Sequence, residues 1–425
     1  MPQYDSYTDS QIPYVGLIPS YWKTAQNKRV MHKEKRICTS YAGQDIISLT
    51  MNGVIVRDLG AGGKMPATFD GYQFVYPGEL LMCLFDIDVT PRCVGKVYNE
   101  GLTSPAYSSF ILHDNADLGY YYYYYLMLDH TKELLHLAKN LRHSLTEEQL
   151  GQIKVPLPPL SEQRTIAAFL DAKTAHIDAI IAEAKSSIEE YKAWKASIIY
   201  EAVTKGLDPD VEMKDSGVEW IGDMPSKWGR TKLANCFCTI GSGTTPTSDD
   251  DSYYVGNINW LQSGDINGSV VRTTKKQVSE EAYNKFSALK TYKAPFIAIA
   301  MYGASIANTS IVEIDACTNQ ACCVFSEPNQ FISMEYAFYA VLGAKEELLL
   351  SARGGTQPNI NQDILKKLMI PIPSKTEQEQ IVHSLGFKCG RINELISEKE
   401  ALIKELEAYK KSLIFEIVTG KRRVC

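Results

Sequence analysis

The segment Ser197-Ile-Ile-Tyr-Glu-Ala-Val-Thr204 recurs near the end of the chain as Ser412-Leu-Ile-Phe-Glu-Ile-Val-Thr419. These segments close a longer duplication, in which residues 153–203 align without a gap onto residues 368–418. The offset is constant at 215, the spacing between Pro156 and Pro371. Self-similarity at a fixed spacing is the signature of a repeated structural unit. The chain therefore contains one structural segment twice, and this repeat decides the fold.

A shorter repeat opens each copy. Asp9-Ser10, Gly16, Pro19-Ser20 and Trp22 recur as Asp215-Ser216, Gly222, Pro225-Ser226 and Trp228, at an offset of 206. Each copy therefore has an opening motif, an insert of roughly 120 residues and a closing segment. The copies agree at their ends and differ in the middle. A duplicated frame around two unlike inserts predicts two readers of different targets.

The closing segments are predicted to be long helices. A Pro-x-Pro sequence starts each one, and a proline cannot stand in a helix interior. After Pro159, no further proline occurs until Pro209 in the first copy, and none follows Pro373 in the second. Ser161 and Thr376 directly precede a Glu-Gln pair, and we expect them to cap the first turns.

Apolar residues in both closing segments recur at the heptad spacing of a coiled-coil seam. The predicted seam consists of Leu170, Ile177, Ile181, Ile188, Tyr191, Ile198, Leu385, Ile392, Ile396, Ile403, Leu406 and Leu413. Lys195, Lys399 and Lys410 interrupt it, as single polar residues do where they fix a register. About 40 helical residues make a rod of roughly 60 Å. We expect the two rods to pair antiparallel; the alternative is two separate amphipathic helices, each packed on its own domain.

The inserts are predicted to be mixed α/β domains. Residues 46–50, 79–85 and 296–300 are short apolar runs of the kind that form strands. Glycine-rich loops lie at residues 60–64, 241–246 and 354–357. The run Tyr120 to Tyr125 could stack on nucleic-acid bases, but it leads into a helix-like stretch, so we expect a partly buried helix.

Composition sets broad limits. The net charge of −6 argues mildly against nucleic-acid binding, although a local basic patch can coexist with an acidic remainder. One basic cluster consists of Lys28, Arg29, Lys33, Lys35 and Arg36, and a solvated helix face explains it equally well. The ten cysteines have no metal-ligand spacing, and we expect them to be small buried residues. No signal peptide or membrane-spanning run is present, which predicts a cytoplasmic location.

Signals of catalysis fail on inspection. Pro209-Asp-Val-Glu-Met-Lys214 superficially resembles a nuclease motif, but one residue between Asp210 and Glu212 leaves no room for two converging strands. No Asn/Asp-Pro-Pro-aromatic motif of adenine methyltransferases occurs. No phosphate-binding G-x-x-x-x-G-K-[ST] loop occurs either. We therefore expect no catalytic residue, no metal site and no ATP site in this chain.

The repeated frame carries a family resemblance. Gly16-x-x-Pro19-x-x-Trp22 before an insert, and Pro156-Leu-Pro-Pro159 with Glu162-Gln163 before a long helix, resemble the specificity subunits of type I restriction–modification systems. The second insert resembles a common subtype through three segments: Gly241-Ser-Gly-Thr-Thr-Pro246, Trp260-Leu-Gln-Ser-Gly-Asp265 and Gly355-Thr-Gln-Pro-Asn-Ile360. The first insert lacks these glycines, and its counterpart before Pro156 reads Arg142-His-Ser-Leu-Thr146.

The resemblance implies a non-catalytic α+β protein with a pseudo-twofold internal repeat. Its two mixed α/β target-recognition domains would be separated by a long antiparallel two-helix coiled coil. Each domain would read half of a bipartite site in double-stranded DNA, and the helices would set the gap. Two methyltransferase subunits would bring S-adenosylmethionine, and restriction/motor subunits would use ATP and Mg, so this chain binds no cofactor itself. The domains are expected at 1–152 and 207–367 (with a linker), and the helical regions at 153–206 and 368–425.

Candidate DNA contacts follow from residue chemistry, because cations bind phosphates while hydroxyl and amide groups read base edges. The candidates are Lys64, Arg92, Arg142, Ser242, Thr244, Thr245, Gln262, Ser263, Thr356 and Gln357. For each one, a plain solvated loop residue is the alternative. Two rival functions remain: an enzyme that cuts or modifies DNA, and a scaffold whose helices only assemble partners.

Overall fold

The structure is a computed structural model that describes residues 3–60, 66–90, 92–138, 144–247, 250–352 and 359–424. The chain divides into two compact units. Unit 1 comprises residues 1–185 and 400–425, and unit 2 comprises residues 186–399. Each unit therefore contains one insert together with part of each long helix. Within the described residues, no helix is long and apolar enough to cross a membrane.

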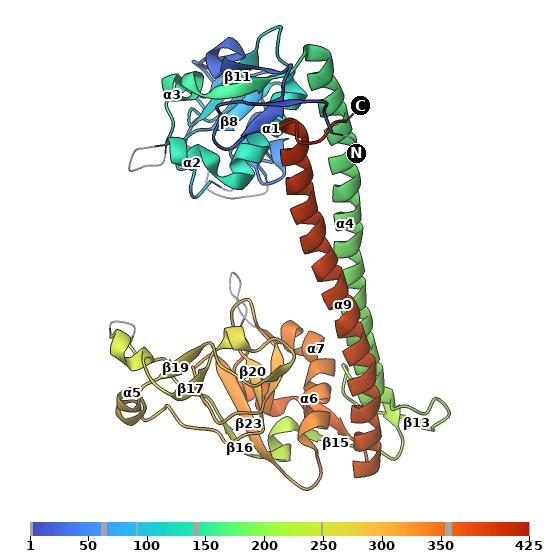
Figure 1. Ribbon diagram of the computed structural model, residues 1–425. Helices are drawn as coiled ribbons and strands as arrows, with labels where there is room; N and C mark the ends of the chain where they lie inside the picture. Colours follow the sequence, from blue (N-terminus) through green and yellow to red (C-terminus); the bar gives the residue numbers. More distant parts are fainter. Residues whose placement is uncertain are drawn as a thin grey trace. The chain divides into compact units, whose positions relative to one another are not determined.

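Unit 1 contains two four-stranded sheets, ordered β6-β5-β10-β7 and β4-β11-β8-β9, and two short strand pairs, β1-β2 and β12-β3 (Figure 1). The strands are β1 (Tyr7–Asp9), β2 (Leu17–Pro19), β3 (Lys23–Gln26), β4 (Met31–Glu34), β5 (Ile46–Thr50), β6 (Gly53–Val56), β7 (Gln73–Val75), β8 (Leu80–Cys83), β9 (Val94–Lys96), β10 (Gly101–Thr103), β11 (Tyr107–Leu112) and β12 (Lys154–Leu157). The shorter helices are η1 (Asn27–Arg29), α1 (Leu118–Thr131), α2 (Glu133–Leu137) and α3 (Glu147–Gln152).

Unit 2 contains a five-stranded sheet, β16-β23-β20-β21-β18, a three-stranded sheet, β19-β17-β22, and the pairs β13-β14 and β15-β24. The strands are β13 (Met213–Asp215), β14 (Asp223–Pro225), β15 (Gly229–Lys232), β16 (Phe237–Gly241), β17 (Ile258–Leu261), β18 (Val270–Val271), β19 (Lys276–Val278), β20 (Phe296–Ala300), β21 (Thr309–Val312), β22 (Cys317–Thr318), β23 (Cys322–Pro328) and β24 (Met369–Ile372). The shorter helices are η2 (Leu233–Cys236), η3 (Asp251–Tyr254), η4 (Ser263–Asp265), α5 (Glu280–Lys285), α6 (Met334–Gly343), α7 (Lys345–Leu350) and α8 (Gln362–Lys367).

The tyrosine run forms the buried helix α1, as predicted. Tyr120, Tyr121, Tyr124 and Tyr125 are fully buried, and three of their hydroxyls have partners inside the unit. The hydroxyl of Tyr120 donates to the Val418 carbonyl (2.8 Å), that of Tyr121 to the Pro156 carbonyl (2.8 Å), and that of Tyr125 to Asn27 Oδ1 (2.6 Å). A buried tyrosine hydroxyl normally needs such a partner. This helix is therefore core structure, not a platform for bases.

Two long helices, α4 (Leu160–Lys205, 46 residues) and α9 (Lys375–Val418, 44 residues), run through both units. They pack against each other within each unit. In unit 1, Lys410 Nζ lies 2.6 Å from Asp178 Oδ2, and Tyr4 contacts both Glu162 and Arg423. The start of α4 therefore lies beside the end of α9, so the helices are antiparallel.

Unit 2 has the same antiparallel arrangement. Lys195 Nζ donates to Asn393 Oδ1 (2.9 Å), and the residues after α4 lie beside Glu377 near the start of α9. Lys195 and Lys410, which interrupt the predicted seam, thus make polar contacts across the helix pair. The predicted seam is otherwise apolar: Leu170, Ile177, Ile181, Ile188, Leu385, Ile392 and Leu413 are buried, whereas Tyr191, Ile198, Ile396, Ile403 and Leu406 are half-buried.

The predicted helix caps are wrong. Ser161 lies inside the first turn of α4, and Thr376 lies inside that of α9. The capping residue of α9 is Ser374, whose hydroxyl accepts a hydrogen bond from the Glu377 backbone N–H (3.3 Å), while Glu377 Oε2 accepts from the Ser374 N–H (3.0 Å). This pair of hydrogen bonds is a capping box with Ser374 as the N-cap and Glu377 three residues later. Both helices begin earlier than predicted.

The cysteine prediction holds with one exception. Eight of the nine described cysteines are buried, but Cys238 on β16 is exposed. It follows the buried Phe237 along an outer strand of the five-stranded sheet, where successive side chains point to opposite faces, so its side chain points to solvent.

Candidate nucleic-acid interface

The loop Gly241–Pro246 of unit 2 lies tightly against the sheet because of its glycines. A Cβ at Gly243 would lie 1.8 Å from the Thr318 carbonyl oxygen, and one at Gly241 would lie 2.4 Å from the Tyr292 hydroxyl. Real Cβ atoms do not come this close. Only glycine fits against the backbone at position 243, and a Cβ at position 241 would require the Tyr292 side chain to move. The glycines thereby fix the positions of Ser242, Thr244 and Thr245.

Amide side chains from distant parts of the chain bind this loop. The Gln362 side-chain amide donates to the Ser242 hydroxyl (3.1 Å), and the Thr245 hydroxyl donates to Gln320 Oε1 (2.5 Å). The Trp260 indole N–H donates to the Thr244 carbonyl (3.2 Å). Gln320 and Gln362 were missed by sequence reasoning. Neither stands in a motif, and only the folded chain brings them to the loop.

Gln262 and Ser263 adjoin the same place. They follow β17, and the Gln262 backbone N–H donates to Asp265 Oδ2 (3.0 Å), which fixes the turn. The Asn319 N–H donates to the carbonyl of Leu261 (3.0 Å), so this turn is tied to the one that carries Gln320. The structure therefore brings five predicted contacts, from two segments, into one group. We call Ser242, Thr244, Thr245, Gln262, Ser263, Gln320 and Gln362 the polar patch.

The chemistry of the polar patch suits recognition of base edges. Hydroxyl and amide groups both donate and accept, and base edges in the major groove present both kinds of partner. The members are exposed or half-buried. A cation lies beside it: Lys275 Nζ donates to the carbonyl of Gly264, the residue after Ser263 (3.4 Å). Contact with DNA stays a prediction for every one of these residues.

The remaining candidates fall in two groups. Lys64, Arg142, Thr356 and Gln357 lie outside the described residues. Arg92 is described, and its guanidinium is engaged inside unit 1. It donates to the carbonyls of Val94 (3.1 Å) and Met51 (2.8 Å) and to the Tyr122 hydroxyl. These bonds fix the position of its charge without neutralising it.

The basic cluster near the N-terminus is partly neutralised. Arg36 Nη1 lies 2.6 Å from Glu79 Oε1, and Lys33 Nζ lies 3.8 Å from Glu147. The nuclease-like stretch shows no converging carboxylates: Asp210 and Glu212 are exposed, and Lys214 Nζ donates to the Trp228 carbonyl (2.7 Å). In the described part of the chain, no group of three His, Cys, Asp or Glu side chains is placed to hold a metal.

The repeated Trp and Glu residues hold the frame. The indole N–H of Trp22 donates to Glu162 Oε2 (3.0 Å), and that of Trp228 donates to Glu377 Oε1 (3.0 Å). Burial raises the pKa of Glu377, but the hydrogen bonds that Ser374 and the Trp228 indole donate to it outweigh burial, and the pKa is lowered. Each unit thus ties its opening motif to the first turn of the following helix by the same contact.

The glutamine that follows makes a second repeated contact. Gln163 accepts from the Asp117 N–H (2.8 Å) and donates to the carbonyls of Pro158 (2.8 Å) and Asn115 (3.1 Å). Gln378 accepts from the Ser333 N–H (2.9 Å) and donates to the carbonyls of Phe331 (2.8 Å) and Pro373 (3.1 Å). Both glutamines are completely buried. The repeat in the sequence is therefore a repeat of hydrogen bonds.

Known proteins match both copies. The profile of the Type I restriction modification DNA specificity domain matches residues 93–190 and 225–405. The MjaVIII specificity subunit of a Methanocaldococcus jannaschii type I restriction enzyme is 27% identical over 64% of this chain and 63% of its own length. The EcoR124I/EcoR124II specificity subunit of Escherichia coli is 24% identical, over 61% of each chain. The matched parts thus span about three-fifths of the curated relatives.

A solved structure shares the fold. That structure was determined to explain complex assembly and conformational transition of the type I R-M system. It superposes on this chain with a TM-score of 0.69 at 16% sequence identity. The superposition covers 94% of this chain and 98% of the other. Because the family profile matches well over half of the sequence and falls on both copies of the repeat, the chain belongs to the type I restriction modification DNA specificity family.

Proposed function

We propose that this chain is the DNA-sequence-specificity subunit of a type I restriction–modification complex, and that each insert reads one half of a bipartite site. One observation carries this proposal. Identical frame contacts, Trp22 with Glu162 and Trp228 with Glu377, enclose two inserts with different sheets and different surface residues. When one of two linked modules has bound its half-site, the other is held at a high effective concentration near the second half-site. This arrangement suits a target in two halves.

The chain supplies recognition and not catalysis in this proposal. Its partners are double-stranded DNA, two methyltransferase subunits that carry S-adenosylmethionine, and restriction/motor subunits that use ATP and Mg. The helix pair is the docking surface for the methyltransferase subunits, and the complex works in the cytoplasm. The exposed aromatic side chains of Trp194 and Phe387 on the long helices are candidate contacts for a partner.

Exchange of single inserts tests the two-reader proposal. Residues 237–329 are suitable for exchange, because Phe237 pairs with Pro328 in neighbouring strands and the frame contacts stay intact. Residues 31–112 are the matched segment in unit 1, where Met31 pairs with Leu112. Each would be replaced by the corresponding segment of a relative with a known target. Methylation-sensitive sequencing of host genomes that express each chimera then reads the target.

Each exchange is expected to change one half of the methylated site and to leave the other half as it was. A change in both halves, or in neither, contradicts the two-reader proposal. The purified chain with Mg, S-adenosylmethionine and ATP is expected neither to cut nor to methylate DNA, and activity there favours the enzyme reading. A complex without any sequence preference favours the scaffold reading.

The helix pair is proposed to set the gap between the half-sites. Insertion of one heptad near Ala184 in α4, with a matching insertion in α9, adds about 10 Å of helix. We expect the accepted gap to change while both half-site sequences persist. An unchanged gap would remove the ruler role and leave the two-reader proposal standing.

A further inference from the structure

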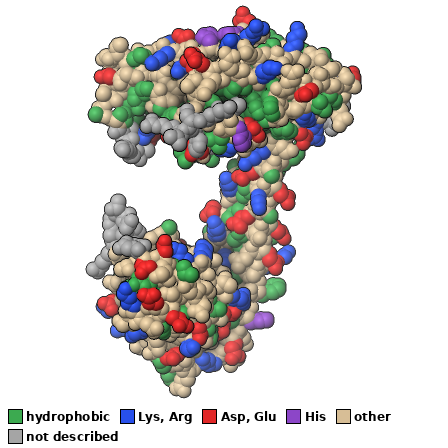
Figure 2. Space-filling view, turned by 60° about the vertical axis from the view of Figure 1, so that its left-hand side comes forward, with side chains coloured by type: hydrophobic (Ala, Val, Ile, Leu, Met, Phe, Trp, Pro, Cys, Tyr) green, Lys and Arg blue, Asp and Glu red, His purple; other side chains and the backbone are tan. Residues whose placement is uncertain are grey.

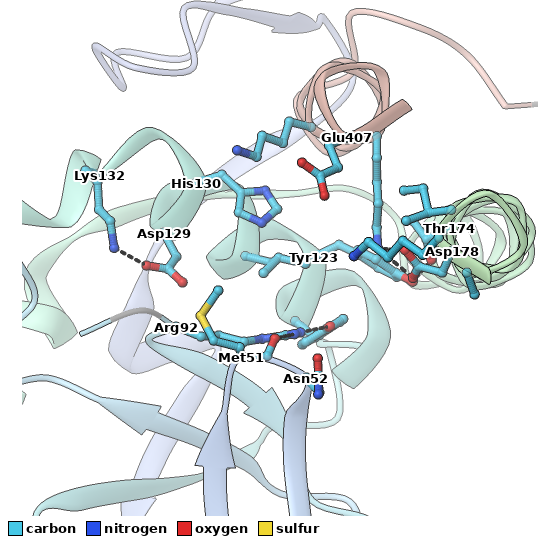
Figure 3. Close-up of a pocket in the computed structure, with 17 residues that line it drawn as sticks. Met51, Asn52, Arg92, Tyr123, Asp129, His130, Lys132, Thr174, Asp178 and Glu407 are labelled. Atoms are coloured by element: carbon cyan, nitrogen blue, oxygen red, sulfur yellow. Dashed lines mark hydrogen bonds and ion pairs between the residues drawn. The ribbon is translucent and has the colours of Figure 1, made fainter. Parts of the chain in front are cut away.

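A cavity of about 840 Å³ lies in unit 1, where the insert meets both long helices. Five segments line it: the turn between β5 and β6, Arg92 two residues before β9, the second half of α1 together with Lys132 just after it, and one stretch each of α4 and α9. Figure 3 shows Arg92 and Asn52 reaching it from the sheet side, Thr174 and Asp178 from α4, and Glu407 from α9.

The lining of this cavity is rich in cations. Its cationic residues are Arg92, Lys132, Lys185, Lys410 and Lys411, and its carboxylates are Asp129, Asp178 and Glu407. The surplus of positive charge is local, since the whole chain carries −6. Figure 2 shows Lys and Arg side chains, mixed with carboxylates, on the stretch of the helices next to the insert of unit 1.

Two of the three carboxylates are already engaged by the protein. Asp129 accepts from Lys132 Nζ (3.0 Å) and from the Cys93 N–H (2.9 Å), and Asp178 pairs with Lys410 (2.6 Å). Lys185 and Lys411 are exposed and have no carboxylate partner among the described residues. Their charges, together with that of Arg92, are free to act on a ligand.

Arg92 is held ready for an anion. Its bonds to Val94, Met51 and Tyr122 use three of its five N–H groups, all with uncharged acceptors. Two N–H groups and the full positive charge remain. A cation fixed in this way loses little conformational entropy when an anion binds, which favours binding.

The pKa of His130, which also lines the cavity, is affected by burial and by the cations around it. Its Nδ1 is buried and has no hydrogen-bond partner, and its imidazole lies between Asp129 and Glu407 in Figure 3. Burial, followed by the charge of Lys411, lowers the pKa of His130 to about 4, with Arg92 and Lys410 acting in the same direction. The ring is therefore neutral at pH 7 and can donate one hydrogen bond to an anionic oxygen.

The second copy keeps one of these lysines. At the offset of 215, Lys195 corresponds to Lys410, and Asn393 takes the place of Asp178. Lys195 Nζ donates to Asn393 Oδ1 (2.9 Å), as Lys410 pairs with Asp178. A lysine that contacts the other long helix thus recurs in both units, although the inserts differ.

Resting on the proposed function, we infer that this cavity binds the sugar–phosphate backbone of DNA that is held by unit 1. Pockets for small organic molecules are mainly apolar with few polar groups, whereas eight of the 17 residues that line this cavity are charged. A single phosphate reaches only groups within about 3 Å of its oxygens. Cations spread over α4, α9, the segment before β9 and the residue after α1 fit an extended polyanion better. The contact would hold DNA without reading its sequence.

The test compares charge variants of the full chain in its natural complex. Lys185→Gln with Lys411→Gln removes two free charges, and Lys173→Gln is the matched control, because that lysine lies over the Phe169 ring and outside the cavity. The probe is a random-sequence 30-base-pair duplex, titrated at several salt concentrations. A duplex that carries the recognition site is titrated in parallel.

The double variant is expected to bind the random duplex about tenfold more weakly, and its log–log salt slope should fall by roughly 2 because each phosphate contact contributes about 0.9. The preference for the recognition site should persist, and Lys173→Gln should match the wild type. Glu407→Gln, which removes an opposing charge, should tighten binding about twofold. An unchanged slope in the double variant overturns the inference. If the wild-type complex binds the recognition-site duplex no better than the random duplex, the proposed function is overturned instead.

A titration with inorganic phosphate tests whether the cavity binds the phosphates of DNA or a free anion. Histidine NMR would follow the His130 ring as phosphate is added, with Lys411→Gln as reference. Weak binding of phosphate, displaced by the duplex, supports the backbone contact. Tight phosphate binding that the duplex does not displace overturns it in favour of a free anion. Because both lysines are exposed, the midpoint of thermal unfolding should not change, which separates lost binding from lost folding.

Discussion

Replacement of Gln163 by Met would test whether the repeated hydrogen bonds hold the frame. The substitution conserves side-chain length but leaves three backbone groups without their partner: the buried Pro158 carbonyl and, at half-buried contacts, the Asp117 N–H and the Asn115 carbonyl. Each orphaned group costs about 1–3 kcal/mol. Because water can partly reach the two half-buried groups, we take the lower end of this range for each and expect a loss of about 3 kcal/mol in the free energy of unfolding.

For a unit of this size, 1 kcal/mol lowers the midpoint of thermal unfolding by about 2–4 °C, so the expected drop is roughly 10 °C. Differential scanning calorimetry measures it, and hydrogen exchange with mass spectrometry locates it. Gln163→Met should loosen unit 1 around α1 and β12, and Gln378→Met should loosen unit 2 around α6 and β24. Gln380→Met, at an exposed position on α9, is the control and should change little. A drop below about 2 °C for both buried variants, or no difference in location between them, would refute this reasoning.

Three further predictions concern single sites. Gly243→Ala places a Cβ against the Thr318 carbonyl and should displace the loop that carries Ser242 and Thr245, so the half-site read by unit 2 should be lost while the other half persists; sequencing of methylated DNA measures this. His130 is neutral when folded, and the unfolded chain takes up its proton at a higher pH, so its burial should reduce stability as the pH falls from about 6.5 to about 4; urea titrations of His130→Gln should show a flatter pH dependence over that range. Asp178→Lys opposes Lys410 and should lower stability by about 1 kcal/mol, whereas Asp178→Lys with Lys410→Asp should restore most of it in thermal melts.

The frame could be predicted from the sequence because its signals are repeated and periodic. The offset of 215 exposes both long helices, and heptad spacing gives their seam. The strands at 46–50 and 296–300 were predicted at their observed bounds, since apolar runs between turn residues decide them locally. The helix caps were mispredicted because a hydroxyl can cap a helix only if the helix begins beside it. The periodicity of apolar residues does not fix the residue at which a helix begins.

The candidate interface was predictable only in part. Motif residues such as Ser242 and Gln262 stand in recognisable segments, whereas Gln320 and Gln362 join the polar patch through tertiary contacts over long sequence distances. Arg92 was a predicted phosphate contact, but the sequence did not indicate how it is held. Its acceptors come from Met51, Val94 and Tyr122, and no local pattern links these positions.

The frame glutamines suggest how one scaffold can carry two unlike inserts. Gln163 and Gln378 bind the inserts only through backbone atoms, at Asn115 and Asp117 in one unit and at Phe331 and Ser333 in the other. Every residue type supplies a carbonyl, and all but proline supply an N–H. These contacts therefore require a chain path and not a side chain. An insert can change its surface, and with it the proposed target, as long as its chain passes the glutamine in the same way before α1 or α6.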